Sequence, residues 1–417
     1  MKILHISTGY PVSFQGGITN YVRTIAEAQL KNGHDVTVLG GEDKTQFQFN
    51  YVEYSSVKII PFGFSKMIDK KGLKYIEDVL KQGQYDIIHI HMMLDVDRNL
   101  YKVLEPYHYI VSLHDYFFIC PRIQMLQPDR TLCARYDREK CSRCISGLAF
   151  NKAFMRILCK MSQLGDKKGI KISTVPPYIK QFVTEERFQC YKKLLEGADQ
   201  VLPVSNRVQE IYQSSGIKAN YKVLHIGNIS ADNYEEKFFF DWSERKIKVI
   251  MLGSVNYSKG ADLFLQIAEK VDQNRVEIHF WGRSNEYGEK LTEYGVIDHG
   301  AYKQQQIKEI LKEADIGLML SVWEDNGPQV VMELLNNHVP VIGTRMGGIP
   351  DFVNSSNGYL FNPYSETEVD KMIEYINHLS LDDIYKMKQS ITPTVTTKQH
   401  FDDVMKVYSD SLEKNRL

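Results

Sequence analysis

The chain has 417 residues, which is too long for one ordinary domain and predicts at least two. Its composition, 43% hydrophobic and 25% charged, is that of a globular protein, and a formal net charge of −1 excludes the positive field typical of nucleic-acid binding. No run of 18 apolar residues is present, so we expect no membrane-spanning helix.

The first half of the chain predicts strands that alternate with helices. Lys2–Ser7 is too short for a signal peptide and predicts a buried strand, so we expect a cytoplasmic protein whose six cysteines are free or metal-bound. A glycine loop and a helix over 19–31 follow, with Thr19 as its N-cap and Gly33 as its C-cap. Short, continuously apolar runs are typical of strands buried in a parallel sheet, and further runs cover 35–40, 57–62, 86–92, 109–113 and 199–205.

A second series begins near residue 247. Strands are predicted over 247–254, 276–282, 315–321 and 339–344, with helices over 261–271, 286–294, 304–314, 366–379 and 382–390. Strands that alternate with helices predict a doubly wound parallel sheet, and two series predict two Rossmann-like α/β domains that face each other across a cleft. We expect a first domain over 1–228, a polar linker over 229–246, a second domain over 247–395, and a C-terminal helix over 396–417 that packs back on the first.

Candidate ligand-binding residues follow the predicted strands. Open α/β sheets bind ligands at the carboxyl ends of their strands, close to helix N-termini. The residues in such places are Gly16, Gly17, His91, His114, Ser254, Lys259, Gly282, Arg283 and the segment 321–328.

The segment SVWEDNGPQVVME, residues 321–333, is typical of a helix start. Pro328 fits the first helical position, and Asn326 or Gly327 can cap the helix, which leaves free amides and a positive dipole end for an anion or for sugar hydroxyls. Asp325 precedes the helix, while Glu333 lies about one and a half turns inside it, so the two acids could contact opposite ends of one ligand. An ordinary helix start with a surface acid is the alternative interpretation.

This segment resembles the donor-site motif of the family-four glycosyltransferases, which have the GT-B fold. That motif places two acids eight positions apart, as Asp325 and Glu333 are, whereas Glu324 does not fit the spacing. The resemblance implies that Asp325 contacts the donor sugar, together with Asn326, Gly327 and Pro328, and that Glu333 contacts the ribose.

Other stretches resemble the same family in the same order. GSVNYSKG, residues 253–260, is similar to the loop that holds the diphosphate, where Gly253 and Lys259 match. Ser254 stands where an Arg is usual, and Arg283 is expected to replace that cation.

The remaining matches lie on either side of this loop. The segment 338–353 resembles a further family motif, with Asp351 in place of a Glu and His338 in place of a helix-ending Gly. Gly16 and Gly17 resemble the glycines that approach the donor closely, and His114 the active-site histidine that contacts the transferred sugar.

The resemblance implies a hexosyltransferase with His114, Lys259 and Asp325 as catalytic residues. It would move a sugar from a nucleotide-diphosphate sugar to a glycan or lipid-linked acceptor, with retention and without a metal or cofactor, in cell-surface polysaccharide or glycan synthesis. A nucleotide-sugar epimerase of the same fold is the alternative. A NAD-dependent oxidoreductase is disfavoured because no Gly-x-Gly-x-x-Gly follows the first strand. A non-catalytic sugar-binding module does not suit two complete α/β domains.

Two clusters resemble metal sites. Asp95-Val96-Asp97 matches the Asp-x-Asp of metal-dependent glycosyltransferases, but three residues are a weak motif, and we interpret it as a solvated loop. Four thiolates could close a structural zinc site, but their uneven spacing favours separate free thiols over zinc or a disulfide. These cysteines are Cys120, Cys133, Cys141 and Cys144.

The segment 151–172 is basic. Lys152, Arg156 and Lys160 are four residues apart and would share one helix face. Such a helix could rest on an anionic membrane at the inner face, but a solvated charged face is the favoured interpretation.

Overall fold

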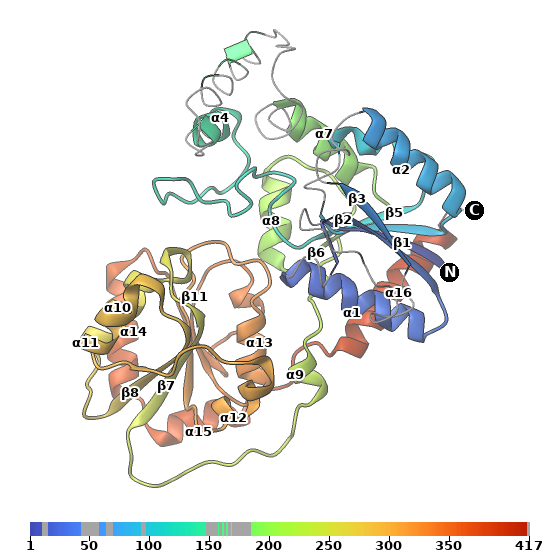
Figure 1. Ribbon diagram of the computed structural model, residues 1–417. Helices are drawn as coiled ribbons and strands as arrows, with labels where there is room; N and C mark the ends of the chain where they lie inside the picture. Colours follow the sequence, from blue (N-terminus) through green and yellow to red (C-terminus); the bar gives the residue numbers. More distant parts are fainter. Residues whose placement is uncertain are drawn as a thin grey trace. The chain divides into compact units, whose positions relative to one another are not determined.

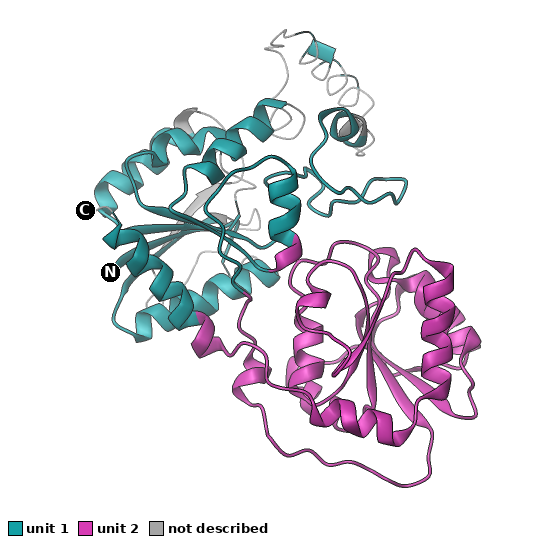
Figure 2. Cartoon of the chain, turned by 180° about the vertical axis from the view of Figure 1, so that it is seen from behind, with its two compact units in different colours: residues 1–204, 208–224, 401–417 teal, residues 205–207, 225–400 magenta. Residues whose placement is uncertain are grey.

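The computed structural model describes residues 1–10, 16–42, 58–63, 70–92, 97–146, 157, 161, 164, 165, 168 and 185–414. The chain forms two compact units. Unit 1 comprises Met1–Val204, Val208–Leu224 and Phe401–Leu417, and unit 2 comprises Ser205–Arg207 and His225–His400 (Figure 2). The residues proposed as a linker, 229–246, therefore lie within unit 2.

Unit 1 is built on a parallel sheet with the strand order β3-β2-β1-β4-β5-β6. The strands are β1 (Lys2–Ile6), β2 (Asp35–Glu42), β3 (Lys58–Gly63), β4 (Ile87–Ile90), β5 (Tyr109–Leu113) and β6 (Gln200–Pro203). Every residue of β4 and β5 is buried, which explains their continuously apolar sequences. The helices are α1 (Gly17–Lys31), α2 (Lys70–Gly83), α3 (Tyr101–Leu104), α4 (Arg138–Ser146), α7 (Glu185–Glu196), α8 (Asn206–Ser214) and α16 (Thr397–Glu413).

The two ends of the chain share the core of unit 1. Val22 and Ile25 of α1 pack with Ile3 of β1 and with Val404 and Tyr408 of α16. Helices α1 and α16 thus lie against the same sheet, although they are distant in sequence (Figure 1).

Unit 2 repeats the architecture with the parallel order β12-β11-β10-β7-β8-β9. The strands are β7 (Ile247–Ser254), β8 (Val276–Arg283), β9 (Ile297–Asp298), β10 (Ile316–Met319), β11 (Val341–Thr344) and β12 (Gly358–Phe361). The helices are α9 (Ile229–Asp232), α10 (Ala261–Lys270), α11 (Gly288–Glu293), α12 (Ile307–Lys312), α13 (Gln329–Asn336), α14 (Glu366–His378) and α15 (Leu381–Gln389). One core contains α10, α11, α14 and α15 and another contains α12 and α13, so both faces of the sheet are covered (Figure 1).

Helix ends differ from the predictions in small ways. The N-cap of α1 is Gly16 rather than Thr19, whose hydroxyl instead donates to the Gly16 carbonyl at 3.1 Å. Gly33 follows the C-cap with a φ of +81°, a left-handed conformation that suits glycine. His338 ends α13 with a φ of +56°, which a histidine tolerates better than a β-branched residue does.

Candidate active site

Three predicted donor-site residues and the strand-end candidate Gly282 lie at one edge of the unit 2 sheet. The register of β7 and β8 pairs Gly253 with Gly282 and Ser254 with Arg283. Gly282 has a φ of +153°, and a Cβ there would lie 1.5 Å from the Gly253 carbonyl oxygen. Only glycine therefore allows these two strand ends to approach so closely.

Arg283 lies beside Ser254 at the end of the neighbouring strand. Both side chains are exposed at adjacent strand ends. No acidic group of the described residues lies within 4.0 Å of the Arg283 guanidinium, so this charge is available to a ligand.

Lys259 and Asp325 form an ion pair. The Lys259 Nζ lies 2.5 Å from Asp325 Oδ2 and 5.5 Å from the centre of the Trp323 ring. Ser321 Oγ donates to the same Asp325 oxygen at 2.9 Å. Val322 N also donates to Ser258 O at 2.9 Å, so the loop after β10 is bound directly to the loop after β7.

The neighbouring acid, Glu324, has a different environment. It is buried, and its Oε1 accepts from Arg207 Nε at 3.1 Å and from Arg207 Nη2 at 2.7 Å. Its Oε2 accepts from Gly347 N at 3.0 Å. Both carboxylate oxygens of Glu324 therefore hold chain segments together, whereas Asp325 faces a lysine and a serine.

The N-terminus of α13 differs from the prediction by one position. Pro328 is the N-cap rather than the first helical residue, and no side chain caps this end. Three buried polar atoms near it have no hydrogen-bond partner among the described residues: Asn326 Oδ1, Gln329 Nε2 and Trp323 Nε1. Buried polar atoms are usually paired, so these atoms and the uncapped amides are available to a ligand.

Glu333 lies inside α13 and is only 7% exposed. Burial raises the pKa of its carboxyl group, while a 2.8 Å hydrogen bond from Gln304 Nε2 opposes this shift. Burial, together with the nearby Glu333, raises the pKa of Tyr302 to about 12. The structure shows no direct bond between Glu333 and Asp325.

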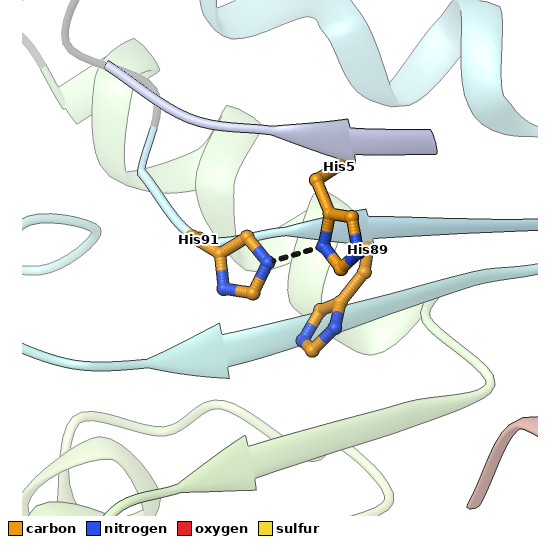
Figure 3. A group of neighbouring side chains, drawn as sticks. All are labelled: His5, His89 and His91. Atoms are coloured by element: carbon orange, nitrogen blue, oxygen red, sulfur yellow. Dashed lines mark hydrogen bonds between the residues drawn. The ribbon is translucent and has the colours of Figure 1, made fainter. Parts of the chain in front are cut away.

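In unit 1, His114 follows β5 and belongs to a chain of buried hydrogen bonds. His114 Nε2 lies 3.1 Å from His91 Nδ1, and His91 Nε2 lies 2.9 Å from His5 Nδ1 (Figure 3). His5 Nε2 lies 2.7 Å from Gln29 Oε1, and Gln29 Nε2 donates to Tyr408 at 3.4 Å.

The side-chain oxygen of Gln29 determines which nitrogen donates and which accepts in each of these hydrogen bonds. An amide oxygen only accepts, so His5 Nε2 must donate, and burial lowers the pKa of His5 to about 4 and keeps the ring neutral. His5 Nδ1 must then accept from His91. For a neutral His91, Nδ1 accepts in turn from His114, which fixes His114 as the tautomer that carries its proton on Nε2.

His5, His89 and His91 also form a group whose ligand atoms lie within 4.8 Å of one another, as a metal site would require. His89 nitrogens, however, contact Tyr408 at 2.7 Å and Ser112 at 2.8 Å. Because every ring nitrogen of the three has a protein partner, hydrogen bonding explains the cluster.

Asp115 follows His114 directly. Its Oδ1 accepts from Phe117 N at 2.8 Å, and burial raises its pKa to about 6, although Phe117 and the Arg187 charge oppose the shift. Gly17 begins α1, and a Cβ there would meet no atom of the described residues within 4 Å.

Some predicted features have other roles, and some site residues were not predicted. Asp97 caps a 3₁₀ turn by accepting from Asn99 N at 2.7 Å, while Asp95 lies outside the described residues. Asp351 accepts from His225 Nε2 at 2.9 Å and from Asn206 N at 2.8 Å. The sequence analysis missed a group of polar residues because their roles depend on contacts between distant segments: Gln29, Arg207 and Gln304.

A cavity of about 480 Å³ lies elsewhere in unit 2. It is bounded by β7, β8 and α12, and Trp281 stacks on His299 there with ring centres 4.2 Å apart. None of the predicted site residues lines it.

Two family models match the chain. The model described as Glycosyl transferases group 1 matches residues 232–392, and the model described as Glycosyltransferase Family 4 matches residues 15–149. Together these matches cover well over half of the chain.

Curated relatives and solved structures agree with these models. An uncharacterised glycosyltransferase of Methanocaldococcus jannaschii, MJ1607, is 22% identical over 93% of this chain and 94% of its own length. The sulfoquinovosyl transferase SQD2 of Arabidopsis thaliana is 23% identical over 45% of this chain, and this match spans only 40% of that protein.

Among solved structures, a glycosyltransferase from Rickettsia africae superposes with a TM-score of 0.66 at 13% identity, over 99% of this chain and 98% of its own. Anabaena HepE in complex with UDP-glucose superposes with a TM-score of 0.57 at 14% identity, over 100% of this chain and 99% of its own. At these identities the likeness shows the fold alone, which is the GT-B arrangement of two parallel-sheet domains.

Proposed function

Because the chain belongs to the family 4, group 1 glycosyltransferases, we propose that it transfers a hexosyl group from a nucleotide-diphosphate sugar to a glycan or lipid-linked acceptor. The observation that carries this proposal is the Lys259–Asp325 ion pair at the strand ends of unit 2. The exposed Arg283 and the uncapped start of α13 lie at the carboxyl edge of the same sheet. The relative that binds UDP-glucose is consistent with such a donor.

The charges at this edge suit a diphosphate leaving group. Lys259 and Arg283 would balance the negative charge that builds up as the sugar–phosphate bond breaks, and the free amides of α13 would add hydrogen bonds. This supply of protein cations supports a reaction without a metal ion. Asp325 orients Lys259 and can accept from a sugar hydroxyl, while Glu333 can accept from the ribose.

His114 is proposed to contact the transferred sugar from unit 1. On the tautomer derived above, His114 carries its proton on Nε2 and donates it to His91. We further propose retention of the anomeric configuration. In that reaction the acceptor hydroxyl attacks on the face that the diphosphate leaves, and the departing phosphate takes the hydroxyl proton, so no enzymic nucleophile is needed.

A membrane-bound acceptor is also consistent with the structure. In the basic segment the described side chains Ile157, Met161 and Leu164 are 56%, 49% and 60% exposed, at helical spacing. Exposed apolar side chains in a segment whose sequence is basic suit peripheral contact with anionic lipid. None of the helices in the described residues is long and apolar enough to span a bilayer.

A donor panel tests the proposed function. Thermal unfolding of the whole protein is followed with UDP-, GDP-, ADP- and dTDP-sugars, each at saturating concentration. One class of nucleotide sugar should raise the melting temperature, because a ligand that binds only the folded state stabilises it. A protein stabilised by none of them would contradict the proposal.

A further inference from the structure

A small cavity in unit 1 is lined by four cysteines: Cys120, Cys133, Cys141 and Cys144. Its volume is about 20 Å³, which leaves room for roughly one water-sized particle. All four side chains are free thiols rather than disulfides. Four thiols around the space of a single atom are the ligand set of a structural zinc site.

Local folding brings these cysteines together from three pieces of chain. Cys120 lies in the turns that follow β5, and its amide donates to Tyr116 O at 2.6 Å. A short hairpin returns the chain to this turn, because Cys133 N donates to Met125 O at 2.8 Å. Cys141 and Cys144 are three residues apart in α4 and therefore lie on one side of that helix. Such Cys-x-x-Cys pairs are common zinc ligands.

Positive charge around the cavity matches the charge of a zinc–tetrathiolate centre. One Zn²⁺ with four thiolates carries a net charge of −2, and Arg122 and Lys140 line the cavity. The buried Arg187 interacts electrostatically with Cys120 and Cys141. Its guanidinium also donates to the backbone oxygens of Phe117 and Phe118, so it is held in place there.

We propose that Cys120, Cys133, Cys141 and Cys144 together bind one Zn²⁺ as a structural site. Each thiol releases its proton to solvent as its Zn–S bond forms, so one ion displaces four protons. No three of these sulfur atoms, all within the described residues, lie within 4.8 Å of one another, so the thiols must close around the ion to reach Zn–S distances of about 2.3 Å.

The proposed zinc would stabilise the conformation of the segment that follows His114. The segment 120–144, which carries the four cysteines, is tied to the rest of unit 1 through Tyr136. The Tyr136 ring stacks on Phe188 with centres 3.8 Å apart, and its amide donates to Ser215 Oγ at 2.9 Å. Tyr136 lines the cavity and anchors this segment to unit 1, while the metal would hold the turns of the segment together.

Metal analysis of the purified full-length protein tests this inference directly. Inductively coupled plasma mass spectrometry should find about one zinc per chain, and the Co²⁺-substituted protein should show the intense visible bands of a tetrahedral thiolate site. The double change Cys141→Ser and Cys144→Ser should remove the zinc. As a matched control, Cys190→Ser alters a buried thiol outside the cavity and should retain one equivalent.

A further variant allows for poor folding of the double mutant. Cys144→His can still coordinate zinc, so it should keep the metal and shift the Co²⁺ spectrum. Wild-type protein with no stoichiometric zinc, with iron instead, or with a disulfide among these cysteines would overturn the proposal. So would a well-folded double mutant that retains the metal. None of these results bears on the donor panel, which reports on unit 2.

Discussion

Two adjacent acids in unit 2 show how the position of a single residue decides its role. Glu324 holds Arg207 and the Gly347 amide, and it is 4% exposed. Asp325, one residue later, binds the side chains of Lys259 and Ser321. Chemically similar carboxylates therefore serve chain packing in one case and, on our proposal, donor binding in the other.

We expect Asp325→Asn and Glu324→Gln to affect different properties. Asp325→Asn preserves shape but removes the charge that orients Lys259, so kcat/KM should fall by about a hundredfold with little change in stability. Glu324→Gln weakens a buried, charged interaction and should lower the free energy of unfolding by about 1–3 kcal/mol. Steady-state kinetics and urea denaturation of both variants check this, and equal, mild effects on both properties would contradict it.

Asp115 should make stability depend on pH in an unusual direction. Its pKa is raised by burial from 3.8 to about 6, so the folded protein binds a proton that the unfolded chain has lost. The contribution of Asp115 to stability therefore falls as pH rises from about 4 to about 6 and stays low above that range. Asp115→Asn should remove this loss and be more stable than wild type at pH 7 by about 1–3 kcal/mol.

Urea denaturation of both proteins at pH 4.5 and pH 7 measures this effect. The difference between wild type and variant isolates Asp115 from the other titrating groups. A difference that does not change between the two pH values would show that Asp115 is not perturbed.

At the scale of elements, glycines let strand ends and loops converge on the proposed donor site. Gly260 joins a 3₁₀ turn (Tyr257–Lys259) to α10 with a φ of +80°, and a Cβ there would lie 2.0 Å from Leu320 O. This contact places the loop that carries Lys259 against the end of β10. Sequence patterns predicted the strands, but these approaches depend on pairings between strands distant in the chain.

Gly260→Ala and Gly300→Ala separate crowding from backbone strain. Gly300 has a similar φ of +74°, but a Cβ there meets nothing within 4 Å. Gly300→Ala should cost only the left-handed strain, about 1–2 kcal/mol. Gly260→Ala adds a clash with backbone and should cost several kcal/mol and weaken donor binding. If both variants lost the same free energy of unfolding in denaturation experiments, the close approach of Gly260 to Leu320 would be unimportant.

The histidine chain connects α1, three strands of unit 1 and α16 to His114. Gln29→Leu removes the acceptor that sets the direction of this chain, so the tautomer of His114 should change and turnover should fall about tenfold or more. Donor affinity, which we place in unit 2, should not change. Nitrogen-15 NMR of the histidine rings and kinetics measure both effects.

Tyr408→Phe is the matched control. It also removes buried hydrogen bonds, to Gln29 and to His89, but leaves the Gln29 oxygen on His5. Both variants should lose about 1–3 kcal/mol of stability, yet only Gln29→Leu should alter the tautomer. A similar change of the His114 tautomer in both variants would show that Gln29 has only a structural role.

At the scale of the whole molecule, two copies of one architecture arise from two series of apolar runs. Those runs predicted the strands well because strands buried on both faces are almost wholly apolar, as β4 and β5 are. The short edge strand β9 and the strand β12, whose middle residues are half-buried, carry weaker patterns and were not predicted. Spacing selected Asp325 over Glu324, but the partners of either acid follow only from tertiary contacts.

The most direct test of the central claim is a sugar-transfer assay with the donor that the panel identifies, run with and without extracted cellular glycans and lipids. Mass spectrometry should detect one added hexose on an acceptor, no epimerised donor when acceptor is absent, and loss of transfer in Lys259→Ala while Lys270→Ala, an exposed change at the C-terminus of α10, remains active. Conversion of the donor to an epimer without any acceptor, or full transfer by Lys259→Ala, would contradict the account.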